Sequence, residues 1–440
     1  MLRGSIFITT LAAIAICTVP TVARAAANCG AGPTGLVPLS DLGAGLYNGL
    51  EGGLYAGGMN GRPSGHEAAG LAIAQEIAPL DTLGNPDAGS GRIVLISIGM
   101  SNCTQEFQAF LPKAGADPEK NPRVLAIDCA VGGQSADRIH SPTAAYWDSV
   151  YSRLRGHGSS PAQAQVVWIK EANATPHGGF PQSADTLLWN LGTIVRLIHQ
   201  KLPNVRIAYL TSRIYAGYAS TPLNPEPYAY ESGFAVKWLV GAQIAGEDSL
   251  NYDPSAGTVE APWLSWGPYL WADGMSPRND GLVWPCSYFS TADGTHPAAA
   301  GRDLVADSLL TFFKADATAR PWFLSPTAAA DGSGSAHGAG GESLLGAWPN
   351  PCVTGGSTRL RFTLDRARPV AVTIFNVSGK EVRRIPHPGG LGLNSVAWDG
   401  TLEGGSQARP GVYFYRVEGS EPSRADSARG ARVILLRSGP

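Results

Sequence analysis

The residues RIVLISIGMSN at positions 92–102 decide the fold that this chain adopts. Positions 92–98 form a short apolar and β-branched run, which is typical of a strand buried on both faces of a sheet. Positions 99–102 follow as a turn, in which a glycine permits a tight bend and a serine favours the start of a helix. The stretch therefore predicts a strand, a turn and a helix in direct succession.

Three further runs repeat this pattern, and segments with helical spacing separate them. Seven aliphatic residues between Leu187 and Leu202 recur on one helical face, and Pro203 then stops the helix. Strands that alternate with helices predict a parallel sheet covered on both faces, so we expect a three-layer α/β/α sandwich over residues 26–325. The other expected strands are Arg123–Ile127, Gln165–Ile169 and Val205–Leu210, and the other expected helices are His66–Ile77, Ala144–Leu154, Ser232–Ile244 and Gly301–Lys314.

The sequence changes in character after Phe323. Residues 326–344 are mostly small and have little apolar surface to bury, which predicts a flexible linker. Residues 345–440 contain short alternating strands separated by turn residues, which predict a small antiparallel β-sandwich. The strands expected there are Thr358–Leu364, Val370–Phe375, Val382–Ile385, Ser395–Trp398, Gly411–Val417 and Ala431–Leu436.

Composition narrows the classes of partner. Of the 440 residues 44% are hydrophobic, which is enough for a sizeable core, whereas only 15% are charged and the formal net charge is -2. Such a chain produces no strong field that would attract nucleic acid or an anionic lipid surface. We therefore expect no nucleic-acid partner.

The first 25 residues predict a secretory signal peptide. Arg3 precedes an apolar run from Ile6 to Val19, and small residues precede a cleavage point after Ala25. The run is shorter than the roughly 20 residues of a membrane span, and no later apolar stretch approaches that length. We expect the chain to be secreted or displayed on the cell surface, with no membrane span after cleavage.

Five cysteines follow the signal segment, and an oxidising compartment would allow one or two disulfides with an odd thiol left over. Cys103 and Cys129 each come just after an expected strand. We predict that these two pair, with Cys286 as the competing partner of either. The alternative is that both are buried free thiols.

Polar residues follow the expected strands at the edge where a parallel sheet binds its ligands. Ser101 suits a nucleophile surrounded by backbone N–H groups, and the alternative is a helix N-cap. Gly133 either offers a backbone N–H to an oxyanion or only makes a turn. Asn173 is either a side-chain donor or a turn former, and Glu171 comes shortly before it.

The segment 293–297, Asp-Gly-Thr-His-Pro, carries the clearest chemical pattern. A carboxylate and an imidazole three residues apart can meet, so that Asp293 orients His296 while His296 accepts the proton of a serine. We find no convincing set of further ligands at metal-binding spacing. We therefore expect neither a metal nor a cofactor.

In this order and on this fold, Ser101, Gly133, Asn173, Asp293 and His296 resemble the SGNH, or GDSL-like, hydrolase superfamily, which has a flavodoxin-like architecture. The resemblance implies that the serine is the nucleophile and that the aspartate and histidine complete a triad. It also implies an oxyanion hole made by the N–H groups of the serine and the glycine together with the asparagine side chain.

The resemblance covers residues 92–314 and departs from the family in two places. The Gly-Met-Ser-Asn at 99–102 is closer to the Gly-Gln-Ser-Asn of the sialate O-acetylesterase and acetylxylan esterase branch than to Gly-Asp-Ser. Lys170 stands where that branch has Gln-Gly. We take Asn173 as the third oxyanion donor, with Glu171 as the competitor.

Further residues are candidates for contact with the substrate. Aromatic faces suit sugar rings or acyl groups, which favours Trp266, Tyr269 and Trp271; the alternative is that they pack a long insertion. Arg213 ends the fourth strand and is placed to meet a substrate carboxylate, with a structural ion pair as the alternative. Glu171 is the last of these candidates.

Residues 345–440 resemble the FlgD Ig-like and type IX sorting domains. The similar motifs are Trp348-Pro-Asn-Pro351, Asn376-Val-Ser-Gly-Lys380 and Gly411-Val-Tyr-Phe-Tyr415. The resemblance implies export, with secretion machinery or a cell-surface anchor as a partner. The final Ser438-Gly439-Pro440 departs from domains that end at a basic residue.

We therefore predict an exported serine esterase that hydrolyses carboxylic esters and removes O-acetyl groups from carbohydrate. Its substrate would be an acylated carbohydrate or a small ester. The alternatives are a lipase or thioesterase that takes longer acyl chains, and a surface binding protein built on an inactive hydrolase domain. Fold similarity does not choose the substrate.

Overall fold

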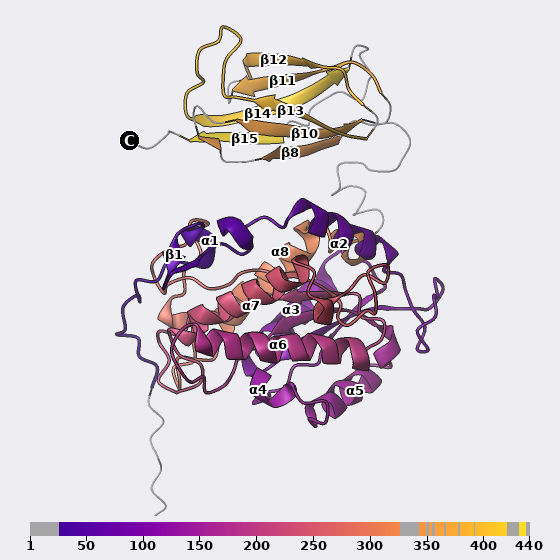
Figure 1. The fold of residues 1–440 in the computed structure, drawn as a ribbon, viewed down its shortest axis with the longest axis vertical. Helices are drawn as coiled ribbons and strands as arrows, with labels where there is room; N and C mark the ends of the chain where they lie inside the picture. Colours follow the sequence, from indigo (N-terminus) through magenta and orange to yellow (C-terminus); the bar gives the residue numbers. More distant parts are fainter. Residues whose placement is uncertain are drawn as a thin grey trace, which may run out of the picture. The chain divides into compact units, whose positions relative to one another are not determined.

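The computed structural model describes most of the chain, and its parts form two units that we describe separately (Figure 1). Among the described residues, the first unit contains 26–116 and 123–318. The expected signal segment 1–25 and nearly all of the expected linker lie outside the described residues. The residues that the structure describes are 26–325, 343–348, 352–353, 357–364, 367–376, 379–390, 392–419 and 431–436.

A five-stranded parallel sheet forms the centre of the first unit, in the order β4-β3-β5-β6-β7. Every residue of β3, β5, β6 and β7 is buried, which explains their apolar runs. Four strands were expected from the sequence; β7 was not, because its tryptophans read as an aromatic loop. The strands are β3 Ile93–Gly99, β4 Val124–Asp128, β5 Ala164–Lys170, β6 Ile207–Leu210 and β7 Trp263–Trp266.

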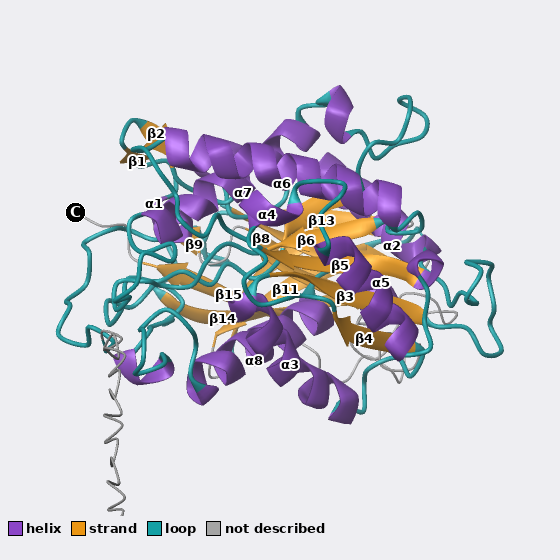
Figure 2. Ribbon diagram, turned by 90° about the horizontal axis from the view of Figure 1, so that it is seen from below, coloured by secondary structure: helices purple, strands orange, loops and turns teal. Residues whose placement is uncertain are grey.

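Helices cover both faces of this sheet, with α6 and α7 over one face and α3 and α8 over the other (Figure 2). Strand order 2-1-3-4-5 with crossover helices is the flavodoxin-like arrangement. The expected three-layer α/β/α fold is therefore confirmed. The main helices are α2 Ser64–Glu76, α3 Ser101–Ala116, α5 Tyr146–Gly156, α6 Gln182–Lys201, α7 Tyr228–Ile244 and α8 Ala299–Ala315, and the short elements are α1 Leu39–Leu42, β1 Leu46–Tyr47, β2 Leu50–Glu51, α4 Ala136–Ile139 and α9 Arg320–Phe323.

The second unit contains two small sheets, in the orders β13-β10-β8 and β12-β11-β14-β15-β9. Alternate residues of both sheets share one core that includes Leu360, Val372 and Trp398. All strand pairs are antiparallel as expected, except that the two-residue β9 runs parallel to β15. The strands are β8 Ser343–Trp348, β9 Cys352–Val353, β10 Thr358–Leu364, β11 Val370–Asn376, β12 Glu381–His387, β13 Gly392–Trp398, β14 Gly411–Gly419 and β15 Ala431–Leu436.

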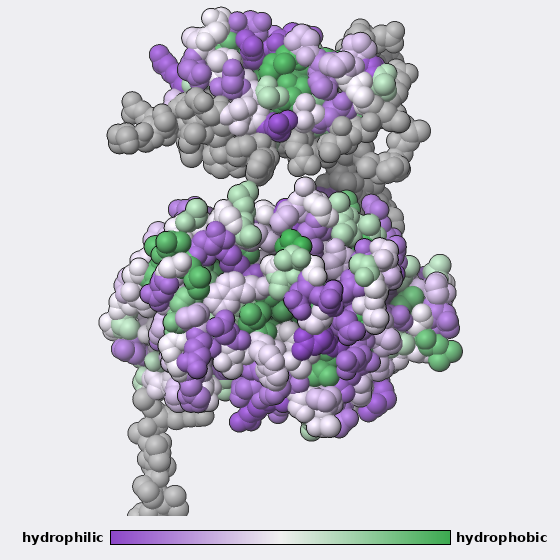
Figure 3. All heavy atoms as spheres, in the orientation of Figure 1, coloured by the Kyte–Doolittle hydropathy of each residue, from purple (hydrophilic) through white to green (hydrophobic). Residues whose placement is uncertain are grey.

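The surface of the first unit mixes hydrophilic and hydrophobic residues on the face that Figure 3 shows. Large exposed apolar side chains, such as Trp189 and Met275, come from separate parts of the sequence. Within the described part of the chain, no helix has both the length and the apolar character that a membrane crossing requires.

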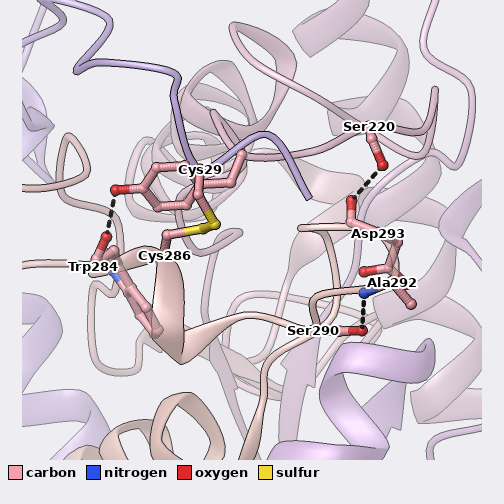
Figure 4. The surroundings of a disulfide bond; sticks show 8 residues. Cys29, Ser220, Trp284, Cys286, Ser290, Ala292 and Asp293 are labelled. Carbon is pink, nitrogen blue, oxygen red and sulfur yellow. Dashed lines mark hydrogen bonds between the residues drawn. A yellow bond between two sulfur atoms is a disulfide. The ribbon is translucent and has the colours of Figure 1, made fainter. Parts of the chain in front are cut away.

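The predicted Cys103–Cys129 disulfide is wrong, because Cys29 pairs with Cys286 instead (Figure 4). The Cα atoms of this pair are 5.5 Å apart although 257 positions separate them in sequence. Cys103 and Cys129 are buried free thiols, and burial raises the pKa of Cys129 to about 12. Strand-end position therefore did not identify the partners, since the true pair joins two distant loops.

Candidate active site

The candidate site lies at the carboxyl ends of β3 and β5. The chain moves from β3 out to β4 and then returns past β3 to β5, so the order of strands reverses there. Ligands of open α/β sheets bind at such a reversal. Ser101 follows β3 and lies at this point of the fold.

A close approach of two chain segments shapes the turn before Ser101. A Cβ atom added at Gly99 would lie 2.5 Å from the Lys170 carbonyl oxygen and 2.5 Å from Cys103 Cβ, so only glycine fits. Two residues later α3 begins at Ser101. The first N–H groups of a helix have no partner within the helix, so the serine starts a turn that can donate hydrogen bonds.

Ser101, His296 and Asp293 form one hydrogen-bonded chain. Ser101 Oγ lies 2.8 Å from His296 Nε2, and His296 Nδ1 lies 2.8 Å from Asp293 Oδ2. An ionised carboxylate only accepts hydrogen bonds, so in the neutral ring Nδ1 donates and Nε2 accepts the serine proton. The Ser101 hydroxyl is therefore engaged with the imidazole, and the structure shows no N-cap bond from it.

Asp293 is fixed in its ionised form by its neighbours. Partial burial alone would raise the pKa of Asp293, but bonds from the backbone N–H groups of His296 (3.0 Å) and Thr295 (2.9 Å) and from the imidazole outweigh burial. The net result is a lowered pKa. A carboxylate that remains charged can stabilise an imidazolium formed during a reaction.

Glycine is required at position 294 to bring the carboxylate and the ring together. Gly294 has φ +62°, and a Cβ atom there would lie 1.9 Å from the Tyr218 carbonyl oxygen. Ser220 donates from its backbone and its hydroxyl to the carbonyl of Asp293, which holds the loop against residues 218–220 (Figure 4). Cys286, which is bonded to Cys29, lies seven positions before Asp293.

Gly133 lies beside the nucleophile. Val131 donates to the Gly99 carbonyl (2.9 Å), which holds the turn after β4 against the end of β3. A Cβ atom added at Gly132 would lie 3.8 Å from Ser101 Cβ. Gly133 has φ +77° and lines the same pocket as Ser101.

A small pocket of about 70 Å³ opens beside Ser101 and His296. Its apolar lining includes Met100, Ala174 and Leu223. Its polar lining includes Ser101, His296, Ser135, Arg213 and Asn224. The space suits a small group bound next to the serine.

Asn173 and Glu171 do not line this pocket. Asn173 lines a neighbouring cavity, and its Oδ1 accepts a bond from Asn190 Nδ2 (2.7 Å). Glu171 is buried below the strand end, its Oε1 has no hydrogen-bond partner, and burial raises its pKa well above the ordinary value. The structure therefore brings neither candidate for the third oxyanion donor into the pocket itself.

The three aromatic candidates lie in the core. Trp266 donates to the Leu54 carbonyl (2.7 Å), and Trp271 donates to Glu226 (2.8 Å). The Tyr269 hydroxyl accepts from the Leu39 N–H (3.0 Å). All three are buried, and none lines the pocket beside Ser101. Their packing corresponds to the alternative stated above.

Lys170 forms a buried ion pair. Its Nζ lies 2.6 Å from Glu106 Oε2 on α3, and both side chains are fully buried. The pair connects the end of β5 to the helix that begins with Ser101. Substitution of one partner would leave a buried charge alone, which is strongly destabilising.

Three polar side chains of the pocket have buried polar atoms without a hydrogen-bond partner. They are Ser135 through Oγ, Arg213 through Nε and Nη2, and Asn224 through Oδ1. We call them the unpaired set. Ser135 and Asn224 were missed by sequence reasoning, because each resembles an ordinary turn or cap residue. The positive φ of Asn224 (49°) is the only structural irregularity that marks it.

Comparison with known proteins identifies the C-terminal region. The family model for the FlgD Ig-like domain matches residues 350–423, so this region contains such a domain. No curated protein matches the chain. The matched residues lie outside the first unit and its Ser101 site.

Similar solved structures each cover a part of the chain. Dimeric latent PorU of Porphyromonas gingivalis is 20% identical, with 23% of this chain and 10% of PorU covered (TM-score 0.20). PorZ of the same organism, a surface component of the type-IX secretion system, is 17% identical over 21% and 11% (TM-score 0.16). YXIM of Bacillus subtilis is 12% identical over 51% and 56% (TM-score 0.31). The chain thus spans about a tenth of PorU and PorZ and just over half of YXIM.

Proposed function

We propose that the first unit is a serine esterase that hydrolyses carboxylic esters. The hydrogen-bonded chain from Ser101 through His296 to Asp293, at the edge of a small pocket, is the observation that carries the proposal. A serine, an imidazole and a carboxylate in this geometry can generate and stabilise a nucleophile.

In the proposed reaction, Ser101 Oγ bonds to the carbonyl carbon of the ester while its proton passes to His296 Nε2. Asp293 stabilises the resulting imidazolium. The N–H groups of Ser101 and Gly133 hold the tetrahedral oxyanion. Asn173 is the proposed third donor: Asn190 occupies its Oδ1, and its amide NH₂ would have to shift from the neighbouring cavity toward the oxyanion.

The intermediate collapses when the carbon–oxygen bond to the alcohol breaks and His296 returns the proton to the leaving oxygen. A water molecule then gives a proton to His296 and attacks the acyl carbon. Release of Ser101 with this proton yields the free acid, so one water is consumed for each ester cleaved.

The size of the pocket favours short acyl groups. Sites that enclose a drug-sized ligand have volumes of roughly 300–1,000 Å³, whereas this pocket has about 70 Å³. The buried aromatic rings do not line a longer channel that joins it. Acetyl is therefore the acyl group that we propose. The polar lining suits an alcohol with further hydroxyl groups, such as a carbohydrate.

Export of the chain is part of the proposal. The signal pattern at 1–25 and the Cys29–Cys286 disulfide both fit an oxidising compartment outside the cytosol. The FlgD Ig-like domain at 350–423 is the proposed contact with secretion machinery or a surface anchor. Fractionation of cells that express the full chain, or a chain ending at residue 325, tests this role: unchanged localisation of the shortened chain would contradict it.

Hydrolysis of p-nitrophenyl acetate and octanoate by the full chain tests the enzymatic proposal. We expect turnover of acetate to exceed that of octanoate and to disappear in Ser101→Ala. Ser64→Ala is the matched control, since Ser64 is also the first residue of a helix but is exposed and far along the sequence from the site. Equal activity of Ser101→Ala and wild type would rule out the mechanism.

A further inference from the structure

We infer that the pocket beside Ser101 contains a carboxylate-binding subsite built on Arg213, and that the ester substrate carries a carboxylate with a neighbouring hydroxyl. The identity of the ligand as substrate rests on the proposed function. The subsite rests on the unpaired set, Ser135, Arg213 and Asn224, all of which line the pocket.

Arg213 is a buried cation without a bonded partner. Its side chain is 1% exposed, and Nε and Nη2 make no hydrogen bond. Among the described residues it forms no ion pair, so the structural ion pair considered as the alternative from sequence is not made. A buried guanidinium without an acceptor is costly, and a ligand acceptor would remove that cost.

Two half-buried arginines of the first unit show the contrast. Arg62 places Nη2 2.8 Å from Asp316 Oδ2 and donates from Nε to Ser265 Oγ (2.9 Å). Arg278 forms an ion pair with Asp280. The fold therefore gives these two guanidinium groups carboxylate partners, whereas the one that lines the pocket has none.

Three acidic groups act on Arg213 electrostatically, but none of them bonds to its Nε or Nη2. They are Glu106, Glu226 and Glu171. Glu106 is already bonded to Lys170, and burial raises the pKa of Glu171 well above its ordinary value and that of Glu226 to about 7. A bound anion would supply the acceptor that the neighbouring acids do not give to Arg213 Nε and Nη2.

Asn224 and Ser135 add the complementary polar atoms. Asn224 Nδ2 donates to the Asn173 carbonyl (3.1 Å), which directs its buried and unpaired Oδ1 elsewhere. That oxygen can accept from a ligand hydroxyl, and the Ser135 hydroxyl can donate or accept. A planar carboxylate matches the fork of a guanidinium, so a carboxylate flanked by a hydroxyl satisfies all three residues.

Binding to the full chain carrying Ser101→Ala tests the subsite without turnover. Calorimetry would compare D-glucuronate with D-glucuronamide, and acetate with acetamide. We expect glucuronate to bind at least tenfold more tightly than its amide. The added Arg213→Met should reduce this preference to less than twofold, whereas Arg62→Gln, which changes a half-buried arginine outside the pocket, should leave it intact.

Asn224→Asp keeps the test valid if Arg213→Met fails to fold. This isosteric change places a carboxylate beside Arg213, and we expect it to abolish the preference for glucuronate. Equal binding of acid and amide, or a preference that survives both substitutions, would overturn the inference. A preference for acetate alone would also overturn it, because the site would then hold the released acid.

Kinetics separate this inference from the proposed function. Wild-type kcat/KM for 4-acetoxybenzoate should exceed that for 4-acetoxybenzamide by tenfold or more. Turnover without this preference would leave the esterase proposal standing and defeat the inference. Absence of all turnover, with the preference for glucuronate retained, would defeat the esterase proposal and leave an Arg213 carboxylate site.

Discussion

Two groups of polar side chains meet in one pocket and differ in how they are bonded. In the Ser101–His296–Asp293 chain, each side-chain polar atom has a partner within 3.0 Å. In the unpaired set, buried polar atoms of Ser135, Arg213 and Asn224 have none. The difference indicates that the groups proposed for the reaction are assembled before a ligand arrives, whereas those proposed for recognition are completed by it.

The two groups also differ in origin. Asp293 and His296 lie in one five-residue segment, which bonds to Ser101 and Asn102 at the start of α3. The unpaired set comes from two separate loops: Ser135 precedes α4, and Arg213 and Asn224 lie between β6 and α7. Changes to either group should therefore have separable effects on the rate, on binding and on stability.

The largest effect is expected from breaking the bonded chain. His296→Ala should lower kcat/KM about 10⁴-fold or more, and the double variant with Ser101→Ala should lose no more than either single one, because such side chains act as a unit. Initial rates on p-nitrophenyl acetate measure this. His157→Ala, at an exposed histidine, is the control; additive losses in the double variant would argue against a shared mechanism.

Removing the disulfide should disturb the bonded chain more than the unpaired set. Cys29→Ser with Cys286→Ser should lower the free energy of unfolding of the first unit by about 2–4 kcal/mol. It should reduce kcat, since Cys286 begins the loop that carries Asp293. Reduced wild type is expected to behave in the same way. Unfolding that is insensitive to reductant would show that this bond does not support the loop.

The unpaired set allows an unusual stability test. Arg213→Met should stabilise the unliganded protein by about 1 kcal/mol, because it removes a buried charge that lacks a partner. Arg62→Met should instead destabilise by about 3 kcal/mol, since it removes the ion-pair partner of Asp316 Oδ2 and leaves only the Thr318 bonds to Oδ1. Urea unfolding of the two variants measures the difference. If both variants are destabilised equally, the Arg213 guanidinium has an acceptor in the folded, unliganded protein.

The smallest effect concerns Glu226, which accepts bonds from Trp271, Ala216 and Tyr230 at the end of the loop that carries Asn224. Burial raises its pKa to about 7 from an ordinary 4.5, despite those bonds. The folded state then keeps a proton that the unfolded state releases, so stability falls as pH rises from about 4.5 to about 7. Glu226→Gln should flatten this slope in urea unfolding at pH 5 and pH 7. Parallel slopes would place the titration on another group.

Much of the fold could be predicted from the sequence. The apolar runs of β3, β4, β5 and β6 and the spacing of α6 depend on residues close together along the chain. The proximity of Asp293 to His296 is local in the same sense, because three positions separate them. The β7 strand was missed because its tryptophans pack as a buried strand although they read as an aromatic surface.

The sequence by itself determined most of the strands and helices, their alternation, and the closeness of Asp293 to His296 along the chain. Only the tertiary structure decided that Cys29 pairs with Cys286, that Trp266 is core, and that Asn173 faces a neighbouring cavity. It also decided that Arg213 has no partner. The physical reason is that secondary structure follows from neighbours along the chain, whereas the bonding of a buried polar atom depends on distant residues that folding brings to it.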